Sequence, residues 1–498
     1  MSNETILPGA SDDETAVPRD ASLFERIANN PRPAAIWAGV LAVLLLLEGG
    51  AVLSMLAVIL RGLVQAIPGV GAGAYGLNEM VQSAKDVPTL LSREFIPNQG
   101  YDVNGGNDGP WAGTFLGLPP AFAWFIRFAL VYLYAGALVA WFINGYRVFR
   151  RHYRYADWTP RDDVVDRFSG HTWGQFGAIV VLIFIVMALF SPALSPTTVE
   201  RNIEQPYSYT IEHFDEESGQ VEEVFVGEAN TNSRSQGGGD SNYGLLSYDD
   251  YGRFHPFGTL DSGKDLFTFM MYGARVSLFV GLMAIGLSGF VATVAAMLTA
   301  YYKGLVDLAT VVVGDSIISI PQLLLLLMAV AVFRGHWIAA IYNRGFLIAL
   351  IFAFTGWPLL WRAIRGPALQ VSSEEWIDAA RSYGQRASVT MRKHMLPYVV
   401  GYLLVYASMT LGGIIISTAA LSFLGLGITS PTPEWGRAVA IGEPYIATQS
   451  WHIGTIPGVL IVLVVTAFNA LGDGIRDAID PQSEGGESTE GAMTGGGA

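Results

Sequence analysis

Long apolar stretches, separated by polar intervals, set the organisation of the chain. A helix needs about 20 mostly apolar residues to cross the roughly 30 Å hydrocarbon core of a bilayer. Eight stretches reach that length: about Ala35 to Leu60, about Ala121 to Ile143, about Phe176 to Leu194, and then near 275–300, 309–333, 346–364, 399–424 and 453–475. The first begins too late, is too long and follows too acidic a tail to be a secretory signal, so it is interpreted as a span. The pattern predicts an all-α membrane protein with about eight transmembrane helices.

Arginine placement predicts which loops face the cytoplasm, because cytoplasmic loops carry an excess of basic residues. The loop after the second stretch contains the run Tyr146–Arg154, which is rich in arginine. Beside a span, this run is interpreted as a positive-inside anchor and not as a nucleic-acid site. The interval after the third stretch is acidic and is expected outside the cell. Eight spans then leave both termini in the cytoplasm.

These boundaries divide the chain into five segments. They are a cytoplasmic acidic tail (1–33), an N-terminal extension with two transmembrane helices and a basic cytoplasmic loop (34–173), a third transmembrane helix with an acidic extracytoplasmic loop (174–256), a transmembrane domain (257–482) and a disordered cytoplasmic tail (483–498). Alternation between about 207 and 228 predicts a small β-hairpin in the outer loop. The hairpin is either a surface for a partner protein or a solvated insertion. The Gly- and Ser-rich run Ser233–Gly239 predicts a flexible linker.

The composition agrees with a membrane protein and excludes several kinds of catalytic and binding site. Hydrophobic residues make up 51% of the 498 residues and charged residues only 14%, against about 25% charged residues in typical soluble proteins. The absence of cysteine excludes disulfides, thiolate metal sites and cysteine nucleophiles. The seven histidines show no metal-ligand spacing. No Gly-x4-Gly-Lys-Ser/Thr phosphate loop occurs, so the sequence predicts no catalytic, metal or nucleotide site.

The charge balance suggests the environment of the protein. The formal net charge is −14 and the pI is about 4.9. Lysine is scarce, since Lys85, Lys264, Lys303 and Lys393 are the only lysines among the 29 basic residues. Strongly acidic surfaces stay soluble in high salt because charge screening there is short-ranged. We therefore hypothesise a halophilic source.

The interval 374–397, between the sixth and seventh stretches, holds the most informative pattern. Because six predicted spans precede it and the N-terminus is expected in the cytoplasm, this interval is also expected in the cytoplasm. Residues 374–383 predict a short amphipathic helix with four apolar or small residues at spacings of three and four. These are Trp376, Ala379, Ala380 and Tyr383. Gly384 is expected to end that helix, and a second short helix over about 386–395 should run to Pro397. Such a helix–turn–helix is suited to a groove in a partner protein.

The spacing of Asp378-Ala379-Ala380, Gly384, His394 and Leu396-Pro397 resembles the coupling ("EAA") loop in permeases of binding-protein-dependent ABC importers. Further motifs are similar to the dipeptide/oligopeptide (nickel) branch of that family. They are His255-Pro-Phe-Gly-Thr259, Gly263-Lys-Asp265, Tyr272-Gly-Ala-Arg-Val-Ser-Leu278, Leu421-Ser-Phe-Leu-Gly-Leu-Gly427, Pro433-Glu-Trp-Gly436, Pro457-Gly458, Phe468-Asn-Ala-Leu-Gly-Asp-Gly-Ile-Arg-Asp477 and Asp480-Pro481. The resemblance covers about 174–482 and is closest to the second (C-type) permease, and a haloarchaeal member is expected. Asp378 stands where the family usually has Glu, and Lys264 where the branch usually has Arg.

The resemblance implies the fold, the partners and the mechanism. The last six spans would form a type I permease domain, paired with a second homologous permease as a heterodimer. Two separate ABC ATPases would bind ATP and Mg and grip the 374–397 loop, and an extracytoplasmic binding protein would deliver the solute. The chain itself would need no cofactor. Di- or oligopeptides are the implied substrate class, with oligosaccharide and nickel as alternatives.

Two ionisable residues inside the predicted spans are further candidates, because such residues are functional by default. Asp315 lies either on the substrate path or in a pair with a neighbouring helix or the second permease. Glu48 is either functional or paired structurally at a helix contact. Two other classes of protein stay open as alternatives. An ion-coupled secondary transporter would need several midplane ionisable residues in related halves, and a membrane sensor would use the acidic outer loop as a receptor.

Overall fold

The computed structural model describes residues 22–51, 53, 89–104, 109–154, 156, 158–215, 218–238 and 241–479. The expected tail 483–498 and most of the expected tail 1–33 lie outside these residues. The longer helices are α1 (Leu23–Asn29), α2 (Pro31–Leu47), α5 (Pro120–His152), α6 (Pro160–Gly170), α7 (Thr172–Leu189), α10 (Leu266–Tyr302), α11 (Gly304–Ile318), α12 (Gln322–Val332), α14 (Gly345–Ser372), α15 (Glu375–Ser382), α17 (Leu396–Phe423), α18 (Trp435–Gly442) and α19 (His452–Ile479). Helix α9 (Val226–Asn232) has seven residues, and the shortest described α-helices, of four residues each, are α8 (Ser191–Leu194), α13 (Trp337–Ala340) and α16 (Ala387–Thr390). The strands form three antiparallel pairs: β1 (Tyr101–Asp102) with β2 (Trp111–Ala112), β3 (Thr210–Asp215) with β4 (Gln220–Phe225), and β5 (Ser247–Tyr248) with β6 (Phe254–His255).

The described helices confirm a multi-pass, all-α membrane protein. Six of them are long and apolar enough to cross a bilayer, and two further pairs reach the necessary length as bent spans. The pairs are α1 with α2, bent by 99°, and α11 with α12, bent by 75°. The expected straight span over 309–333 is therefore wrong. The bend between α1 and α2 precedes the first expected span, about 35–60, whose residues beyond Ala51, apart from Leu53, lie outside the described part of the chain. Helix α2 ends at Leu47, and Pro321, which cannot donate a backbone hydrogen bond, stands at the break between α11 and α12.

The chain divides into two compact units, one formed by residues 1–95 and 132–159 and the other by residues 96–131 and 160–498. In the first unit, aromatic residues join α2 to the second part of α5. Trp37 and Trp141 stack at 4.3 Å between ring centroids, and the indole nitrogen of each donates to the backbone carbonyl of the other. The Tyr134 hydroxyl donates to the Leu44 carbonyl at 2.9 Å. These bonds satisfy the polar ends of aromatic side chains that also supply apolar packing.

Glu48 lies at the end of α2 in the same unit and is buried. Its Oε1 accepts a hydrogen bond from the backbone N–H of Leu91 at 3.1 Å. The paired structural role was one of the two alternatives for this residue, and the hydrogen bond supports it.

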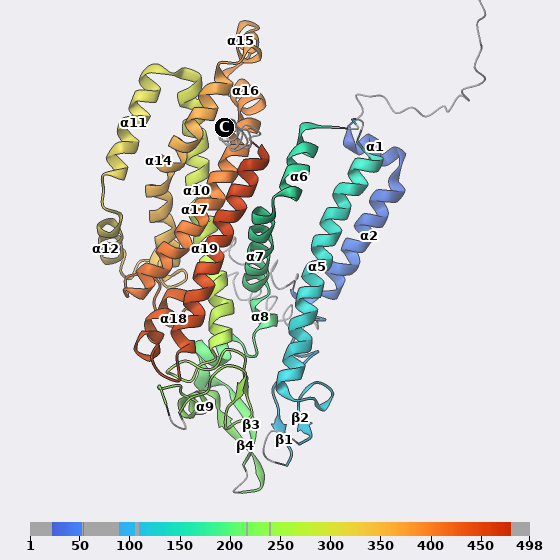
Figure 1. Ribbon diagram of the computed structural model, residues 1–498, viewed down its shortest axis with the longest axis vertical. Coiled ribbons are helices and arrows are strands. Elements are labelled where there is room, and N and C mark those ends of the chain that lie inside the picture. Colours follow the sequence, from blue (N-terminus) through green and yellow to red (C-terminus); the bar gives the residue numbers. More distant parts are fainter. Residues whose placement is uncertain are drawn as a thin grey trace, which may run out of the picture. The chain divides into compact units, whose positions relative to one another are not determined.

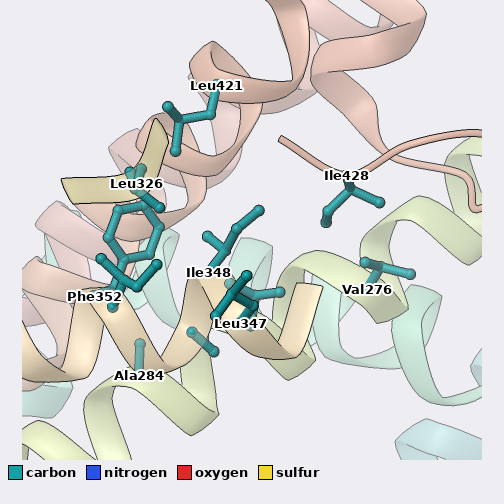
Figure 2. Close-up of a cluster of buried hydrophobic side chains, with 11 residues drawn as sticks. Val276, Ala284, Leu326, Leu347, Ile348, Phe352, Leu421 and Ile428 are labelled. Carbon is teal, nitrogen blue, oxygen red and sulfur yellow. The ribbon is translucent and has the colours of Figure 1, made fainter. Parts of the chain in front are cut away.

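The second unit is a helix bundle built on α7, α10, α14, α17 and α19 (Figure 1). Short helix α15 lies at one end of the bundle, and β3, β4 and α9 lie at the other (Figure 1). One hydrophobic cluster joins α10, α12, α14 and the C-terminal end of α17 through Ala284, Leu326, Phe352 and Leu421 (Figure 2). A second cluster lies nearer α15 and joins it to α10, α14 and the start of α17. Small residues allow close helix approach elsewhere: a Cβ built on Gly177 of α7 would lie 2.5 Å from backbone atoms of α19.

The segment between α7 and α10 forms the end of the second unit opposite α15. Strands β3 and β4 pair in register from Thr210↔Phe225 to Asp215↔Gln220, which confirms the expected hairpin. The expectation of a flexible linker at Ser233–Gly239 is wrong for its first residues. Ser233 and Ser235 are fully buried, and their hydroxyls bond to Asp249 at 2.9 Å and to the Thr259 hydroxyl at 2.8 Å. Small polar side chains are here packing elements and not spacers.

Arg127, on the part of α5 that belongs to the second unit, ties two segments of this end together. Its side chain is fully buried and donates to the carbonyls of Ile96, Ala193 and Ser195 at 2.7–2.9 Å. Two of these carbonyls lie at the C-terminal end of α8, where a helix leaves carbonyls unpaired and favours a positive charge.

The Pro433-Glu-Trp-Gly436 motif locks α18 onto the bundle. Trp435 is fully buried, and its Nε1 donates to the Met270 carbonyl of α10 at 2.8 Å. A Cβ on Gly436 would lie 1.9 Å from the Ala419 carbonyl oxygen of α17, so this position needs glycine. The Glu434 carboxylate caps α18 by accepting from the backbone N–H of Arg437 at 3.1 Å.

Burial raises the pKa of Glu434 to about 7. A carboxyl group with a raised folded pKa favours the folded state while it is protonated, so its contribution to stability is lost as the pH rises from about 4.5 to about 7. We expect Glu434→Gln, which keeps the capping acceptor without a charge, to remove that part of the pH dependence. Thermal unfolding of purified protein from pH 5 to pH 8 measures it. A variant whose unfolding temperature falls with pH as steeply as that of the wild type would contradict this expectation.

Candidate functional site

The backbone of the 374–397 loop follows from its sequence. The eight residues of α15 end at Ser382, and Gly384 adopts a left-handed backbone with φ of +73°. The Gly384 N–H donates to the Arg381 carbonyl, and the Gln385 N–H donates to the Ala380 carbonyl, each at 3.0 Å. This pair of bonds is a Schellman motif, which favours glycine because a side chain disfavours the left-handed backbone. The expected helix and its expected end are confirmed.

One side of α15 anchors the helix to the bundle. Of its eight residues, all of them described, only Ile377 is buried, and it packs in the second hydrophobic cluster. That cluster combines residues of α10 (Ala292, Ala296, Ala300), of α14 (Leu360, Trp361, Ile364, Ala368, Val371) and of the following helix (Met395, Val399). Arg381 adds a second anchor, since it donates to the Tyr301 carbonyl at 3.1 Å and lies over the Tyr301 ring at 4.2 Å. A displacement of α15 would therefore be transmitted to α10, α14 and α17.

The other side of α15 is open. Tyr383 is 92% exposed and Trp376 43% exposed, and Asp378, Ala379 and Gly384 are exposed between them. Trp376 contacts α17 through an approximately parallel ring contact with Tyr398, at 6.2 Å between ring centroids. Apart from this ring contact, the face built from Trp376, Ala379 and Tyr383 is thus open, and it combines aromatic rings with a small central residue.

The second half of the loop differs from expectation. The expected helix over about 386–395 is present as α16 and a π-helical turn at Met391–Met395, but the expectation that it is separate from the next span is wrong, because it continues directly into α17. The result is one helical run from Ala387 to Phe423. Pro397 lies inside this run, as the second residue of α17, directly after the π-helical turn. Pro397 is exposed, whereas His394 and Leu396 are half-buried.

Asp315 has a partner on a neighbouring helix. Its Oδ1 contacts a terminal nitrogen of Arg362 on α14. About half of each side chain stays exposed, 54% for Asp315 and 47% for Arg362. A second pair, Asp307 with Arg365, joins the same two helices, and here Arg365 Nε donates to Asp307 Oδ1 at 2.7 Å. Sequence reasoning selected Asp315 and missed both arginines, although the same rule for charges inside apolar stretches would have found Arg362, which lies in the predicted stretch 346–364.

A buried ionic network lies in the segment between α7 and α10 (190–265), called the outer segment because its acidic sequence predicts an extracytoplasmic position. Asp249 accepts from Arg253 Nε at 2.7 Å and from Ser233 Oγ at 2.9 Å. His255 lies between two carboxylates, with Nδ1 2.8 Å from Asp265 and Nε2 3.3 Å from Asp249. Burial opposes charge on both Asp249 and His255, but their mutual contacts outweigh it: the pKa of Asp249 is lowered by Arg253 and His255, and the pKa of His255 is raised by the two aspartates. In the described part of the chain, no three His, Asp or Glu side chains are grouped as metal ligands.

Sequence comparisons match these features to known membrane transport proteins. Residues 292–484 match the family described as binding-protein-dependent transport system inner membrane component. Residues 159–212 match the N-terminal transmembrane domain of oligopeptide transport permease C. The first match contains the 374–397 loop, and the second contains α7 and α8.

Individual relatives extend the match. A dipeptide transport system permease protein of Alkalihalophilus pseudofirmus is 30% identical over 329 residues, which cover 66% of this chain and 92% of that protein. The corresponding protein of Bacillus subtilis is 34% identical over 228 residues (46% and 69%). A glutathione transport system permease protein of Escherichia coli is 36% identical over 233 residues (46% and 73%). The chain therefore belongs to the family of inner-membrane permeases of binding-protein-dependent transport systems.

Proposed function

We propose that this chain is one permease of an ATP-driven importer that takes up short peptides delivered by an extracytoplasmic binding protein. The observation that carries the substrate class is the match to dipeptide and glutathione permeases, one of them over 92% of its length. In this proposal the second permease is a homologous chain, and the present chain takes the C-type position of a heterodimer. The match of residues 159–212 to oligopeptide transport permease C supports that position.

The proposed coupling element is α15 with the turn after it. Asp378, Ala379, Ala380 and Gly384 would meet a groove of an ATPase subunit, with His394, Leu396 and Pro397 holding the base of the loop. ATP and Mg would be bound by the two ATPases, because this chain contains no phosphate-binding loop. Support comes from the open aromatic face of α15 and its anchors on three bundle helices. This assignment puts α15 and both termini on the cytoplasmic side. Asp315 is proposed to lie on the substrate path.

The acidic, lysine-poor composition leads us to propose that the protein comes from a haloarchaeon and works in molar salt. Activity and folding of the purified complex should then rise as KCl is increased to molar concentration. Indifference to salt over that range would count against a halophilic origin and leave the transport function untouched.

Affinity purification of the tagged protein from gently solubilised membranes, in matching salt, tests the function directly. We expect mass spectrometry to identify a second permease, one or two ATPases and a binding protein. Proteoliposomes containing this complex should accumulate dipeptides only with ATP and the binding protein. Recovery of the chain alone would contradict the proposal, and a binding protein that selects oligosaccharide or nickel would replace the proposed substrate.

A further inference from the structure

Three polar contacts form a ladder between α14 and the bent pair α11–α12. Arg362 pairs with Asp315, Arg365 pairs with Asp307, and Gln322 Nε2 donates to Thr355 Oγ1 at 2.9 Å. Thr355, Arg362 and Arg365 lie on one face of α14, because positions seven and ten residues apart return to the same side of a helix. The ladder therefore marks a continuous polar stripe on helices that are otherwise apolar.

The depth of this stripe argues that it does not face lipid. Helix α14 has 28 residues, about 42 Å at 1.5 Å per residue, and is longer than the roughly 30 Å hydrocarbon core. Arg362 lies about 15 Å from the Ser372 end of α14, within the hydrocarbon thickness when the helix is centred. Half-exposed charges at that depth face water or a protein, since lipid exposure of charge is costly. The stripe is thus part of an aqueous path or of a contact with another chain.

The two ion pairs are built differently. Arg365 holds Asp307 with two nitrogens, Nε and a terminal nitrogen, on the two carboxylate oxygens. Such bidentate pairs are the stronger and more rigid kind. Arg362 contacts Asp315 through one terminal nitrogen only. Each side chain of this pair is more exposed than the corresponding side chain of the Asp307–Arg365 pair. Asp315 also lies one turn before Ser319, where α11 ends at the bend. The Asp315–Arg362 pair is the one that can change partners.

We propose that Asp315 and Arg362 form a subsite of the translocation path that binds the charged ends of a zwitterionic peptide by partner exchange. The peptide carboxylate replaces Asp315 on Arg362, and the peptide ammonium replaces Arg362 on Asp315. The exchange leaves the number of paired charges unchanged, so no uncompensated charge appears in a partly desolvated path. The Asp307–Arg365 pair holds α11 against α14 during this exchange. This inference rests on the proposed import of short peptides.

The test uses the complete complex in proteoliposomes, with its binding protein at saturating concentration. Uptake is measured for a dipeptide, its C-terminal amide and its N-acetylated form. We expect Arg362→Gln to raise the KM for the free-acid dipeptide about tenfold, the loss expected for one charge-assisted hydrogen bond, and to leave the amide nearly unchanged. Asp315→Asn should do the same for the free amine relative to the N-acetylated form. The binding protein is the same in every experiment, so a change in these ratios belongs to the permease.

Three variants serve as controls. Ser316→Ala removes a neighbouring hydroxyl that bonds only within α11, to the Val312 carbonyl, and should leave uptake and both ratios unchanged. Arg365→Gln should lower uptake of all three compounds together, as expected for a structural pair. Arg362→Lys keeps the charge and should keep part of the preference for the free acid, which separates loss of the subsite from misfolding.

Two results would overturn the subsite. The first is an unchanged acid-to-amide ratio in Arg362→Gln together with an unchanged amine-to-acetyl ratio in Asp315→Asn. The second is loss of the second permease from the complex in both variants, with unaltered ratios in the uptake that is left, which would assign the stripe to a subunit contact. Absence of ATP-dependent dipeptide uptake by the wild type would instead contradict the proposed function.

Discussion

Replacement of Ile377 by alanine should reduce peptide uptake at least tenfold while ATP hydrolysis by the assembled complex continues. Ile377 is the buried residue of α15 and fills a cluster shared by three bundle helices. Deletion of a buried isoleucine side chain to alanine costs about 2–5 kcal/mol through lost burial and the cavity left behind. The outer face of α15 is unchanged by this substitution, so the ATPases should still bind. Their movement would then be transmitted poorly, because α15 is loosened from α10 and α14.

The measurement is uptake and ATP hydrolysis by the same proteoliposomes. Val389→Ala, at an exposed apolar position of α16, is the matched control and should retain both activities. Ala379→Asp gives the contrasting failure, because a charged side chain on the outer face should prevent ATPase binding and abolish both activities. Wild-type uptake by Ile377→Ala would mean that α15 does not transmit force through this contact.

Much of the coupling loop could be predicted from sequence because its determinants are local. The spacing of Trp376, Ala379 and Tyr383 predicts a helical face, and Gly384 predicts the helix end, from intrinsic backbone preferences. The direction of that face could not be derived in the same way. Sequence periodicity groups residues on a face, but only the tertiary structure shows that Ile377 turns inward while the aromatic residues turn outward.

Helix breaks and long-range partners were the features that sequence reasoning missed. An apolar run over 309–333 reads as one span, yet Pro321 divides it, because hydropathy averages over a residue that interrupts the hydrogen-bond ladder. The partner of Asp315 is 47 positions away, so its identity depends on how α11 packs on α14. The same holds for Ser233 and Ser235, whose composition suggests a linker but whose hydroxyls satisfy buried groups.

The transport helices and the outer segment differ in how they use charge. On the helices, the Asp315–Arg362 pair is half-exposed and held by one contact, an arrangement suited to repeated rearrangement. In the outer segment, Asp249, Arg253 and His255 are buried and joined by several hydrogen bonds. Buried networks of this kind are rigid when every member is satisfied. The outer segment is therefore a fixed platform at the end of α10, and rearrangement is expected in the bundle.

Substitution of Asp249 by asparagine should be the most destabilising single change in the outer segment. The carboxylate is fully buried and is shared by Arg253, His255 and Ser233. Its removal leaves Arg253 buried without its ion-pair partner, and breaking a buried pair in this way costs about 3–5 kcal/mol. We expect protease cleavage within residues 230–265 and a lower unfolding temperature in detergent, with the bundle still inserted in the membrane. Asp250→Asn, which alters an adjacent carboxylate bonded to the Tyr243 hydroxyl, is the matched control and should have a much smaller effect.

The pH dependence of the same network provides an independent check. Because the pKa of His255 is raised in the folded protein, its contribution is fully present below the unfolded value of about 6.5 and is lost as the pH rises through the folded pKa. The lowered pKa of Asp249 gives a contribution that is present above about 3.8 and is lost only in acid. Protection of residues 230–265 from protease should therefore decline in the wild type as the pH rises above about 6.5 and through the raised pKa of His255. In His255→Gln this decline should be absent. A decline in His255→Gln as steep as that of the wild type would show that a group other than His255 causes it.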